Sequence, residues 1–133
     1  MQEVKSLIEL AKHKNKIDLK RGEERFMDPN WLLDRIIDEI EEVREELKPN
    51  NVACLEDELS DILWGWMVLI EKLKQSKYVS SHEDILKRTL KKYEERILPL
   101  KGDESDHAIW KEVKNRQKEA LAIESLNASS NKH

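Results

Sequence analysis

The fold is decided by two consecutive segments, WLLDRIIDEIEEVREEL at residues 31–47 and VACLEDELSDILWGWMVLIEKLKQSK at residues 52–77. In the first segment, apolar residues recur every three or four positions, which predicts an amphipathic helix. The preceding Asp28-Pro29 is a helix start signal, and KPNN at residues 48–51 predicts a turn between the segments. Because this connection is so short, we expect the two helices to be antiparallel neighbours.

The same spacing predicts three more helices on either side of this pair. One precedes it, one follows Ser80-Ser81 and stops at Pro99, and one starts near Ser105. We therefore expect an all-α protein, an antiparallel helical bundle of four to five helices that forms a single domain over residues 1–125. Residues 126–133 have nothing to bury, and we expect a disordered tail there.

The composition agrees with a helical fold. A chain of 133 residues has the size of one domain. Charged residues make up 39% of it and hydrophobic residues 38%, and it contains three Gly and three Pro. This composition favours charged amphipathic helices over a sandwich or barrel. The lone Cys54 excludes a disulfide within the chain and a cysteine-based zinc site. It fits a reducing environment, so we expect a cytoplasmic protein.

The charge of the chain is unevenly distributed. The net charge is −4, but residues 38–61 hold ten acids and two bases, a local net charge of −8, so the rest carries +4. Duplex nucleic acids require a continuous basic face, and we therefore expect no nucleic-acid partner. The acidic centre suits a cation that is held by carboxylates and carries an anionic substrate.

Residues 62–70, ILWGWMVLI, are apolar on every side of the predicted helix. This run is far shorter than the roughly 20 residues that span a bilayer, and residues 1–16 are charged throughout, so we expect neither a membrane partner nor a signal peptide. A helix that is apolar all round must be enclosed. Either a partner subunit encloses it, in a homodimer or homotetramer, or the helix lies at the centre of the monomer.

Both deciding segments carry paired carboxylates. Glu39 and Glu42 stand three residues apart in the first, and Glu58 and Asp61 stand three apart in the second. This spacing places each pair on one face of its helix, one turn apart. Since the two helices are expected to be neighbours, the two pairs can converge.

Two of these acids also belong to apolar stripes. Glu39 lies between Ile36 and Val43 on its helix, and Glu58 is placed likewise on the next, where an unpaired carboxylate is costly. Four converging carboxylates repel one another unless a divalent cation neutralises them, and oxygen ligands alone indicate Mg²⁺ or Mn²⁺. The alternative is that the acids form solvated helix faces.

The order of these motifs resembles a known family. Asp38-Glu39-x-x-Glu42 followed by Glu58-x-x-Asp61 is similar to the motifs of the all-α nucleotide pyrophosphohydrolases of the MazG type, whose first motif is Glu-Glu-x-x-Glu. KYEERILPLKGD at residues 92–103 resembles the family's basic segment, and Trp110-x-x-x-Lys114 resembles its late Trp-and-Lys element. The chain departs from the family in Asp38 and in KRGEERFMD at residues 20–28, which replaces a tryptophan-containing segment.

The resemblance implies hydrolysis of a nucleoside triphosphate, NTP or dNTP, to the monophosphate and pyrophosphate. It implies Mg²⁺ ligands that are also the catalytic residues, Glu39, Glu42, Glu58 and Asp61, with Asp38 as a further candidate ligand. One of these carboxylates, or the metal, would activate the attacking water. The residues expected to bind the substrate are Trp31 for the base and, for the triphosphate, Lys92, Arg96, Lys111 and Lys114.

Several alternatives stay open on the sequence. On the same scaffold, the chain fits a base-specific dUTP or dCTP pyrophosphatase or a phosphoribosyl-ATP pyrophosphohydrolase, with one metal or two. An alternative of another class is a non-catalytic helical adaptor, whose apolar helix binds a partner and whose acids are merely solvated.

Overall fold

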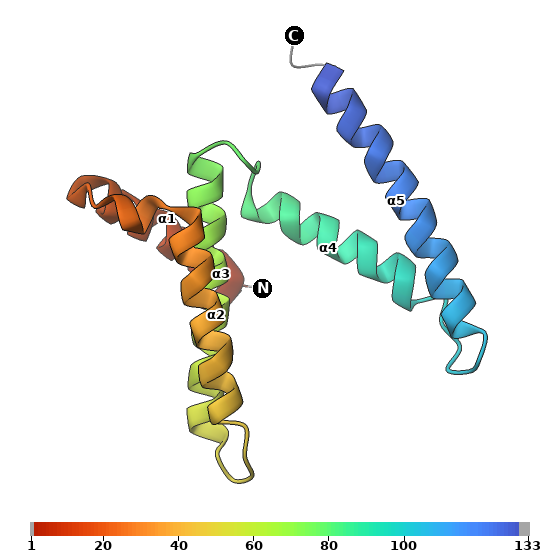
Figure 1. Cartoon of the computed structure of the whole chain (residues 1–133), viewed down its shortest axis with the longest axis horizontal. Coiled ribbons are helices and arrows are strands. Elements are labelled where there is room, and N and C mark those ends of the chain that lie inside the picture. Colours follow the sequence, from red (N-terminus) through yellow and green to blue (C-terminus); the bar gives the residue numbers. More distant parts are fainter. Residues whose placement is uncertain (1, 131–133) are drawn as a thin grey trace. The chain divides into compact units, whose positions relative to one another are not determined.

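The computed structural model describes residues 2–130, which contain helices and no strand, and it confirms the all-α prediction. Along the chain, the elements are α1 (Gln2–Arg21), the 3-10 helix η1 (Glu24–Met27), α2 (Pro29–Glu45), α3 (Val52–Gln75), α4 (His82–Ile97) and α5 (Asp106–Ser130) (Figure 1). Each predicted helix is present, and the observed ends lie close to the predicted ones. No helix within residues 2–130 combines the length and apolarity needed to cross a membrane.

Local signals explain the helix pair that carries the acids. Asp28 caps α2, since its side chain accepts a hydrogen bond from the backbone N–H of Asn30 at 2.9 Å, and Pro29 occupies the first helical position. In the turn, Asn50 has a φ of 56°, a left-handed conformation that asparagine tolerates. Asn51 then donates to the carbonyl of Glu46 at 2.8 Å. The turn reverses the chain, so that α2 and α3 run side by side (Figure 1).

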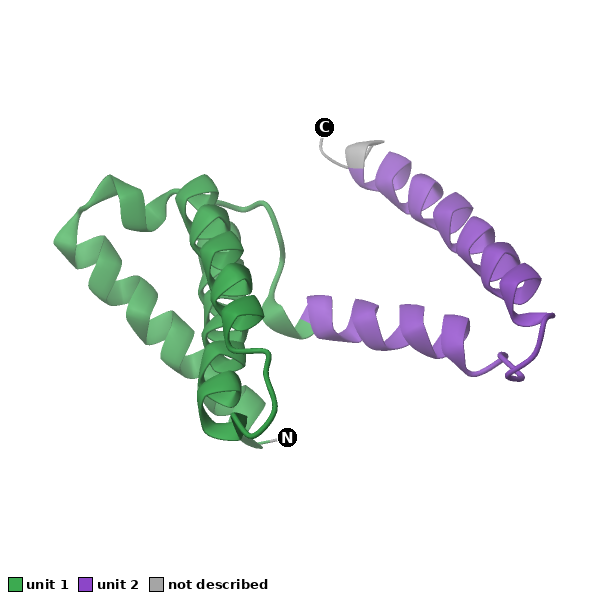
Figure 2. Ribbon diagram, turned by 60° about the horizontal axis from the view of Figure 1, so that its bottom comes forward, with its two compact units in different colours: residues 1–83 green, residues 84–133 purple. Residues whose placement is uncertain are grey.

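The chain divides into two compact units, residues 1–83 and residues 84–133 (Figure 2). The single domain over residues 1–125 therefore stays a prediction. Helix α5 continues through Ser130, beyond the residue where we expected a tail to begin, because no Gly or Pro interrupts it. Residues 131–133 of that expected tail lie outside the described residues.

The core of the first unit forms around the C-terminal half of α3. On one side, Ile8 and Ala11 of α1 pack against Met67. On another, Leu32 of α2 packs against Val68 and Leu69. This part of the apolar run is therefore covered within the chain, as the monomer explanation requires.

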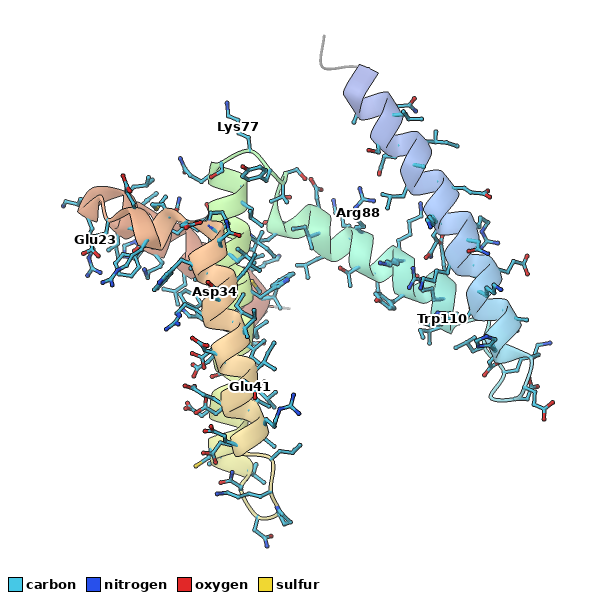
Figure 3. The ribbon with its side chains drawn as sticks, in the orientation of Figure 1. Glu23, Asp34, Glu41, Lys77, Arg88 and Trp110 are labelled. Atoms are coloured by element: carbon cyan, nitrogen blue, oxygen red, sulfur yellow. The ribbon has the colours of Figure 1, made fainter. Side chains whose placement is uncertain are left out.

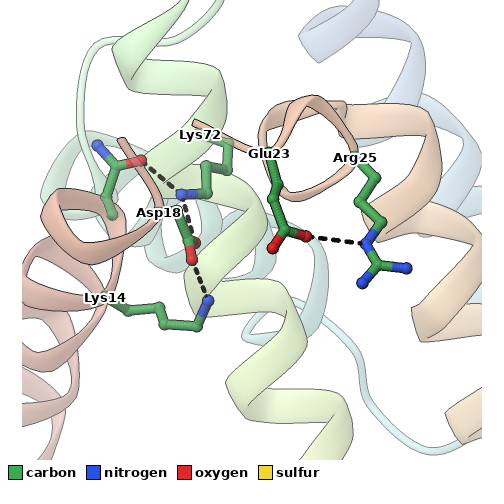
Figure 4. Close-up of polar contacts among 6 residues, drawn as sticks. Lys14, Asp18, Glu23, Arg25 and Lys72 are labelled. Carbon is green, nitrogen blue, oxygen red and sulfur yellow. Dashed lines mark hydrogen bonds and ion pairs between the residues drawn. The ribbon is translucent and has the colours of Figure 1, made fainter. Parts of the chain in front are cut away.

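A buried polar cluster also joins α1 to α3. The Lys72 ammonium donates to Asn15 Oδ1 at 2.6 Å and to Asp18 Oδ2 at 2.8 Å, and Lys14 pairs with the other Asp18 oxygen (Figure 4). Burial alone would raise the pKa of the Asp18 carboxyl, but hydrogen bonds from the two lysines outweigh burial and hold the pKa below its ordinary value. The ion pair fixes α1 at this point on α3.

The second unit is joined by polar contacts between α4 and α5. Arg88 Nη2 donates to both carboxylate oxygens of Glu124, at 2.8 and 3.0 Å. Arg96 donates to the Gln117 side chain at 2.8 Å, and its guanidinium lies over the ring of Trp110, 5.3 Å from the centroid. Figure 3 shows Trp110 in the first turns of α5. These contacts occupy Arg96 within its own unit.

Candidate metal centre

Four carboxylates converge between α2 and α3. Glu39 and Glu42 from α2 and Glu58 and Asp61 from α3 each offer one oxygen, and the four oxygens lie within 4.8 Å of one another. The spacing of three residues aligns each pair along its helix, and the antiparallel turn brings the two pairs to the same level. The structure thus brings together the four acids that the sequence selected.

A glycine outside the predicted site residues lies in the same helix pair. A Cβ at Gly65 of α3 would lie 3.1 Å from Ile36 Cγ1 of α2, which is tighter than ordinary packing. The absence of a side chain therefore lets the two helices approach closely, two turns from Glu58. A glycine inside a helix costs about 1 kcal/mol of helix stability relative to alanine. A glycine in the middle of a predicted helix therefore indicates, from the sequence alone, a position where close packing is required.

The electrostatics of the cluster reflect burial and mutual repulsion. Glu39 is half-buried, and its burial, the neighbouring Glu42, and the charges of Asp61 and Glu58 raise its pKa to about 7. Burial, the neighbouring Glu42, and the charges of Asp61 and Asp57 also raise the pKa of Glu58. Glu42 and Asp61 are exposed, so the cluster opens to solvent on their side.

The donor set fits a divalent cation. Glu39 Oε2 and Glu58 Oε2 are both buried, and neither has a hydrogen-bond partner among the described residues. A buried carboxylate oxygen without a partner is costly, and a cation between the two pairs would satisfy both oxygens and remove the repulsion. Oxygen-only coordination of this kind suits Mg²⁺ or Mn²⁺.

Asp38 lies outside the four converging acids. It precedes Glu39 by one residue, which turns its side chain about 100° around α2, and it forms an ion pair with Arg35. A ligand role would require Asp38 to leave Arg35. Glu41, which is also outside the cluster, pairs with Arg44 at 3.4 Å, as expected of a solvated helix face.

Trp31 stands in the first turn of α2, half-buried and in contact with another aromatic ring. Its ring meets the Phe26 ring edge to face, with centroids 5.4 Å apart, and the Arg35 guanidinium lies 5.6 Å from the Trp31 centroid. Spacings of four, three and four residues place Trp31, Arg35, Asp38 and Glu42 on one side of α2. Trp31 therefore shares the side of α2 on which the carboxylates open, and Phe26 joins it from η1.

The predicted triphosphate ligands all belong to the second unit. Lys92 lies over the Tyr93 ring at 5.7 Å, and Arg96 is held by Gln117 as described above. Lys111 and Lys114 are exposed on α5. A meeting between these basic residues and the carboxylates stays a prediction.

Comparison with protein families identifies the family of the chain. Residues 27–97 match the model of the MazG nucleotide pyrophosphohydrolase domain, a range that includes all four converging carboxylates together with Lys92 and Arg96. Helices α1 and α5 lie outside the matched range. No curated protein and no solved structure matches the chain.

Proposed function

Since the chain belongs to the MazG nucleotide pyrophosphohydrolase family, we propose that it hydrolyses a nucleoside triphosphate, NTP or dNTP, to the monophosphate and pyrophosphate in a Mg²⁺-dependent reaction. The observation that carries this proposal is the set of four convergent carboxylates, two of which hold a buried oxygen without a partner. Solvated acids on a helical adaptor would be exposed or paired, as Glu41 is.

The four acids have distinct positions in the proposed site. Glu39 and Glu58, which are half-buried, would bind the cation from the side of the protein interior. Glu42 and Asp61, which are exposed, would bind it from the solvent side. When bound, Mg²⁺ would supply positive charge to the phosphate oxygens. Mn²⁺ would serve the same donor set.

In the proposed reaction, water attacks the α-phosphorus. One of the four carboxylates accepts a proton from this water, whose oxygen forms a new bond to the α-phosphorus. The bond from the α-phosphorus to the bridging oxygen breaks, and pyrophosphate leaves with the electron pair. The product that gains the water oxygen is therefore the nucleoside monophosphate.

The residues proposed to bind the substrate are those that the sequence indicated. Trp31, with Phe26 beside it, offers an aromatic surface on the open side of the carboxylates and suits a nucleobase. The proposed ligands of the triphosphate tail are Lys92, Arg96, Lys111 and Lys114, and among these the guanidinium of Arg96 best matches phosphate geometry.

The proposed location of the reaction is the cytoplasm, because the exposed thiol of Cys54 fits a reducing compartment.

The proposed chemistry is tested by hydrolysis in ¹⁸O-labelled water with Mg²⁺ and a panel of the common ribo- and deoxyribonucleoside triphosphates. We expect the label in the monophosphate and none in the pyrophosphate. Orthophosphate as the first product, or label in the pyrophosphate, would contradict attack at the α-phosphorus. The panel also distinguishes a base-specific enzyme from a general one, and calorimetry with Mg²⁺ distinguishes both from an adaptor, which would bind no divalent cation.

We also propose that the protein self-associates as a homodimer or homotetramer. Large apolar side chains of α2 and α3 are exposed on the first unit, among them Ile37 at 57%, Leu59 at 48% and Leu63 at 47%. On α2, Leu33, Ile37 and Ile40 form a stripe on the side opposite Trp31 and Glu42. A second copy bound to this apolar face would cover it without covering the opening of the carboxylates.

A further inference from the structure

His82, the first residue of α4, is a histidine with a defined tautomer. Its side chain is buried, with 1% of its surface exposed, and Nε2 lies 2.8 Å from the backbone carbonyl oxygen of Met67 in α3. A carbonyl oxygen only accepts hydrogen bonds, so Nε2 must carry the hydrogen. In a neutral imidazole, Nδ1 is then an acceptor with a free lone pair.

This Nδ1 faces a second acceptor. Glu71 Oε2 of α3 lies 3.8 Å from it, the Glu71 side chain is 9% exposed, and neither atom has a hydrogen-bond partner in the part of the chain that the structure describes. An ionised carboxylate also only accepts. Two buried acceptors thus face each other, and the feature that would satisfy both is one proton between them.

We propose that Glu71 and His82 bind one proton between them, and that this proton closes a latch that holds the first turn of α4 against α3. The proton can reside on either partner. An imidazolium would donate to the carboxylate, or a carboxylic acid would donate to the imidazole. In both cases the Nε2–H bond to Met67 is retained. Above about pH 6.5, where an exposed histidine is mostly neutral, the closed form binds one proton more than the open form. The latch lies outside the carboxylate cluster and goes beyond the proposed hydrolysis.

The charges around the pair come from α1, α3 and α4. Lys12 of α1 and Lys74 of α3 oppose the uptake of a proton, and Glu83 of α4 favours it. Hydrogen bonding to Glu9 raises the pKa of Lys12, and a bond to its own backbone N–H lowers the pKa of Glu83. Both groups therefore keep their charges across about pH 5 to 8, the range in which histidine ordinarily changes charge.

One other histidine lies near the pair. His13 of α1 lines the surface cavity that Glu71 also borders, but its side chain is exposed. It serves as the matched control, because its replacement removes a titrating imidazole from the same region and leaves the latch intact.

Hydrogen–deuterium exchange of the α4 backbone amides measures opening of the latch. Since closing takes up one proton above about pH 6.5, the equilibrium constant for opening should fall as the pH falls from about 8 to 6.5, by up to about tenfold per pH unit. Glu71→Gln places an amide N–H opposite Nδ1 and supplies the hydrogen without a titrating proton. The ratio of exchange between the wild type and this variant cancels the intrinsic effect of pH on amide exchange.

For amides in the first turns of α4, we expect the ratio of exchange in the wild type to exchange in Glu71→Gln to rise as the pH rises from about 6.5 to 8. The ratio of His13→Gln to Glu71→Gln should rise in the same way. Equal pH dependence in the wild type and Glu71→Gln would overturn the latch. Nitrogen-15 NMR of the His82 ring in the intact protein gives a second readout that does not depend on a variant. A proton shared with Nδ1 should appear as the pH falls. A lone pair on Nδ1 that persists at about pH 5, beside an ionised Glu71, would also overturn the latch.

Discussion

Gly65 of α3 faces Ile36 of α2 so closely that a Cβ at Gly65 would come within 3.1 Å of Ile36 Cγ1. This approach sets the distance between the two helices that carry the acids. Substitutions at Gly65 therefore test whether helix spacing controls the metal centre.

For Gly65→Ala, we expect a change in the free energy of unfolding of at most about 1 kcal/mol, because the gain in helix propensity offsets the tight contact. Gly65→Leu should destabilise the protein by about 1–3 kcal/mol through overpacking and should weaken Mg²⁺ binding. Thermal unfolding and calorimetry measure the two effects. Ala53→Leu, at an exposed position of α3, is the control, and equal Mg²⁺ affinity in both leucine variants would contradict the spacing argument.

Replacing either half-buried acid should abolish turnover without unfolding the protein. Glu39→Gln and Glu58→Gln keep the shape of the side chain and remove its charge. We expect circular dichroism to show unchanged helicity, and the melting temperature without metal to rise because repulsion is relieved. Glu41→Gln on the same helix is the control and should remain active. Near wild-type activity in Glu39→Gln or Glu58→Gln would rule out the proposed roles of these acids.

The raised pKa of Glu39 predicts how stability depends on pH without metal. Its value of about 7 in the folded protein exceeds its ordinary value of 4.5, so the folded state binds the proton more tightly. Stability should therefore decrease as the pH rises from about 4.5 to 7 and then level off. Melting temperatures across this range measure the trend, which Glu39→Gln should reduce and saturating Mg²⁺ should reverse. A wild-type melting temperature that rises over the same interval would contradict the assignment.

The ion pair between Lys72 and Asp18 predicts a strong asymmetry between single and double variants. Both side chains are 1% exposed, so Lys72→Met alone leaves a buried carboxylate that only Lys14 neutralises, and the loss should be about 3–5 kcal/mol. Lys72→Met combined with Asp18→Leu should recover much of this loss. Denaturant unfolding measures both variants. Additive losses in the double variant would show that the two residues do not act as a pair.

Self-association should depend on the exposed apolar stripe of α2. Ile37→Glu places a charge in the middle of that stripe, and we expect light scattering at micromolar concentration to give a monomer where the wild type gives a dimer or tetramer. Glu45→Lys, on a different side of the same helix, is the control and should leave the assembly intact. A monomeric wild type would refute the proposal.

The sequence predicted the features that depend on neighbours along the chain. The helix ends follow from caps and breakers such as Asp28 and Pro99, and the alignment of Glu39 with Glu42 follows from helical spacing alone. The convergence of the two acid pairs needed only one further inference, that a short turn makes antiparallel neighbours.

The features that the sequence did not reveal depend on partners far along the chain. Lys72 pairs with Asn15 and Asp18 across more than fifty residues, and no local pattern marks which lysine will be buried. His82 had no signal either, because its partners lie on the preceding helix. The apolar run at residues 62–70 indicated that other residues must pack around it. Helix α1 supplies some of these residues, but nothing in its sequence identifies the helix against which it packs.

All four converging carboxylates lie between residues 39 and 61, on two helices joined by one turn. The contacts that assemble the centre are therefore of low contact order, and closing so short a connection is entropically inexpensive. The hairpin can form before α1 docks and before the chain beyond α3 is folded. The acids then repel one another early in folding. A divalent cation present at that stage would accelerate folding as well as stabilise the folded protein.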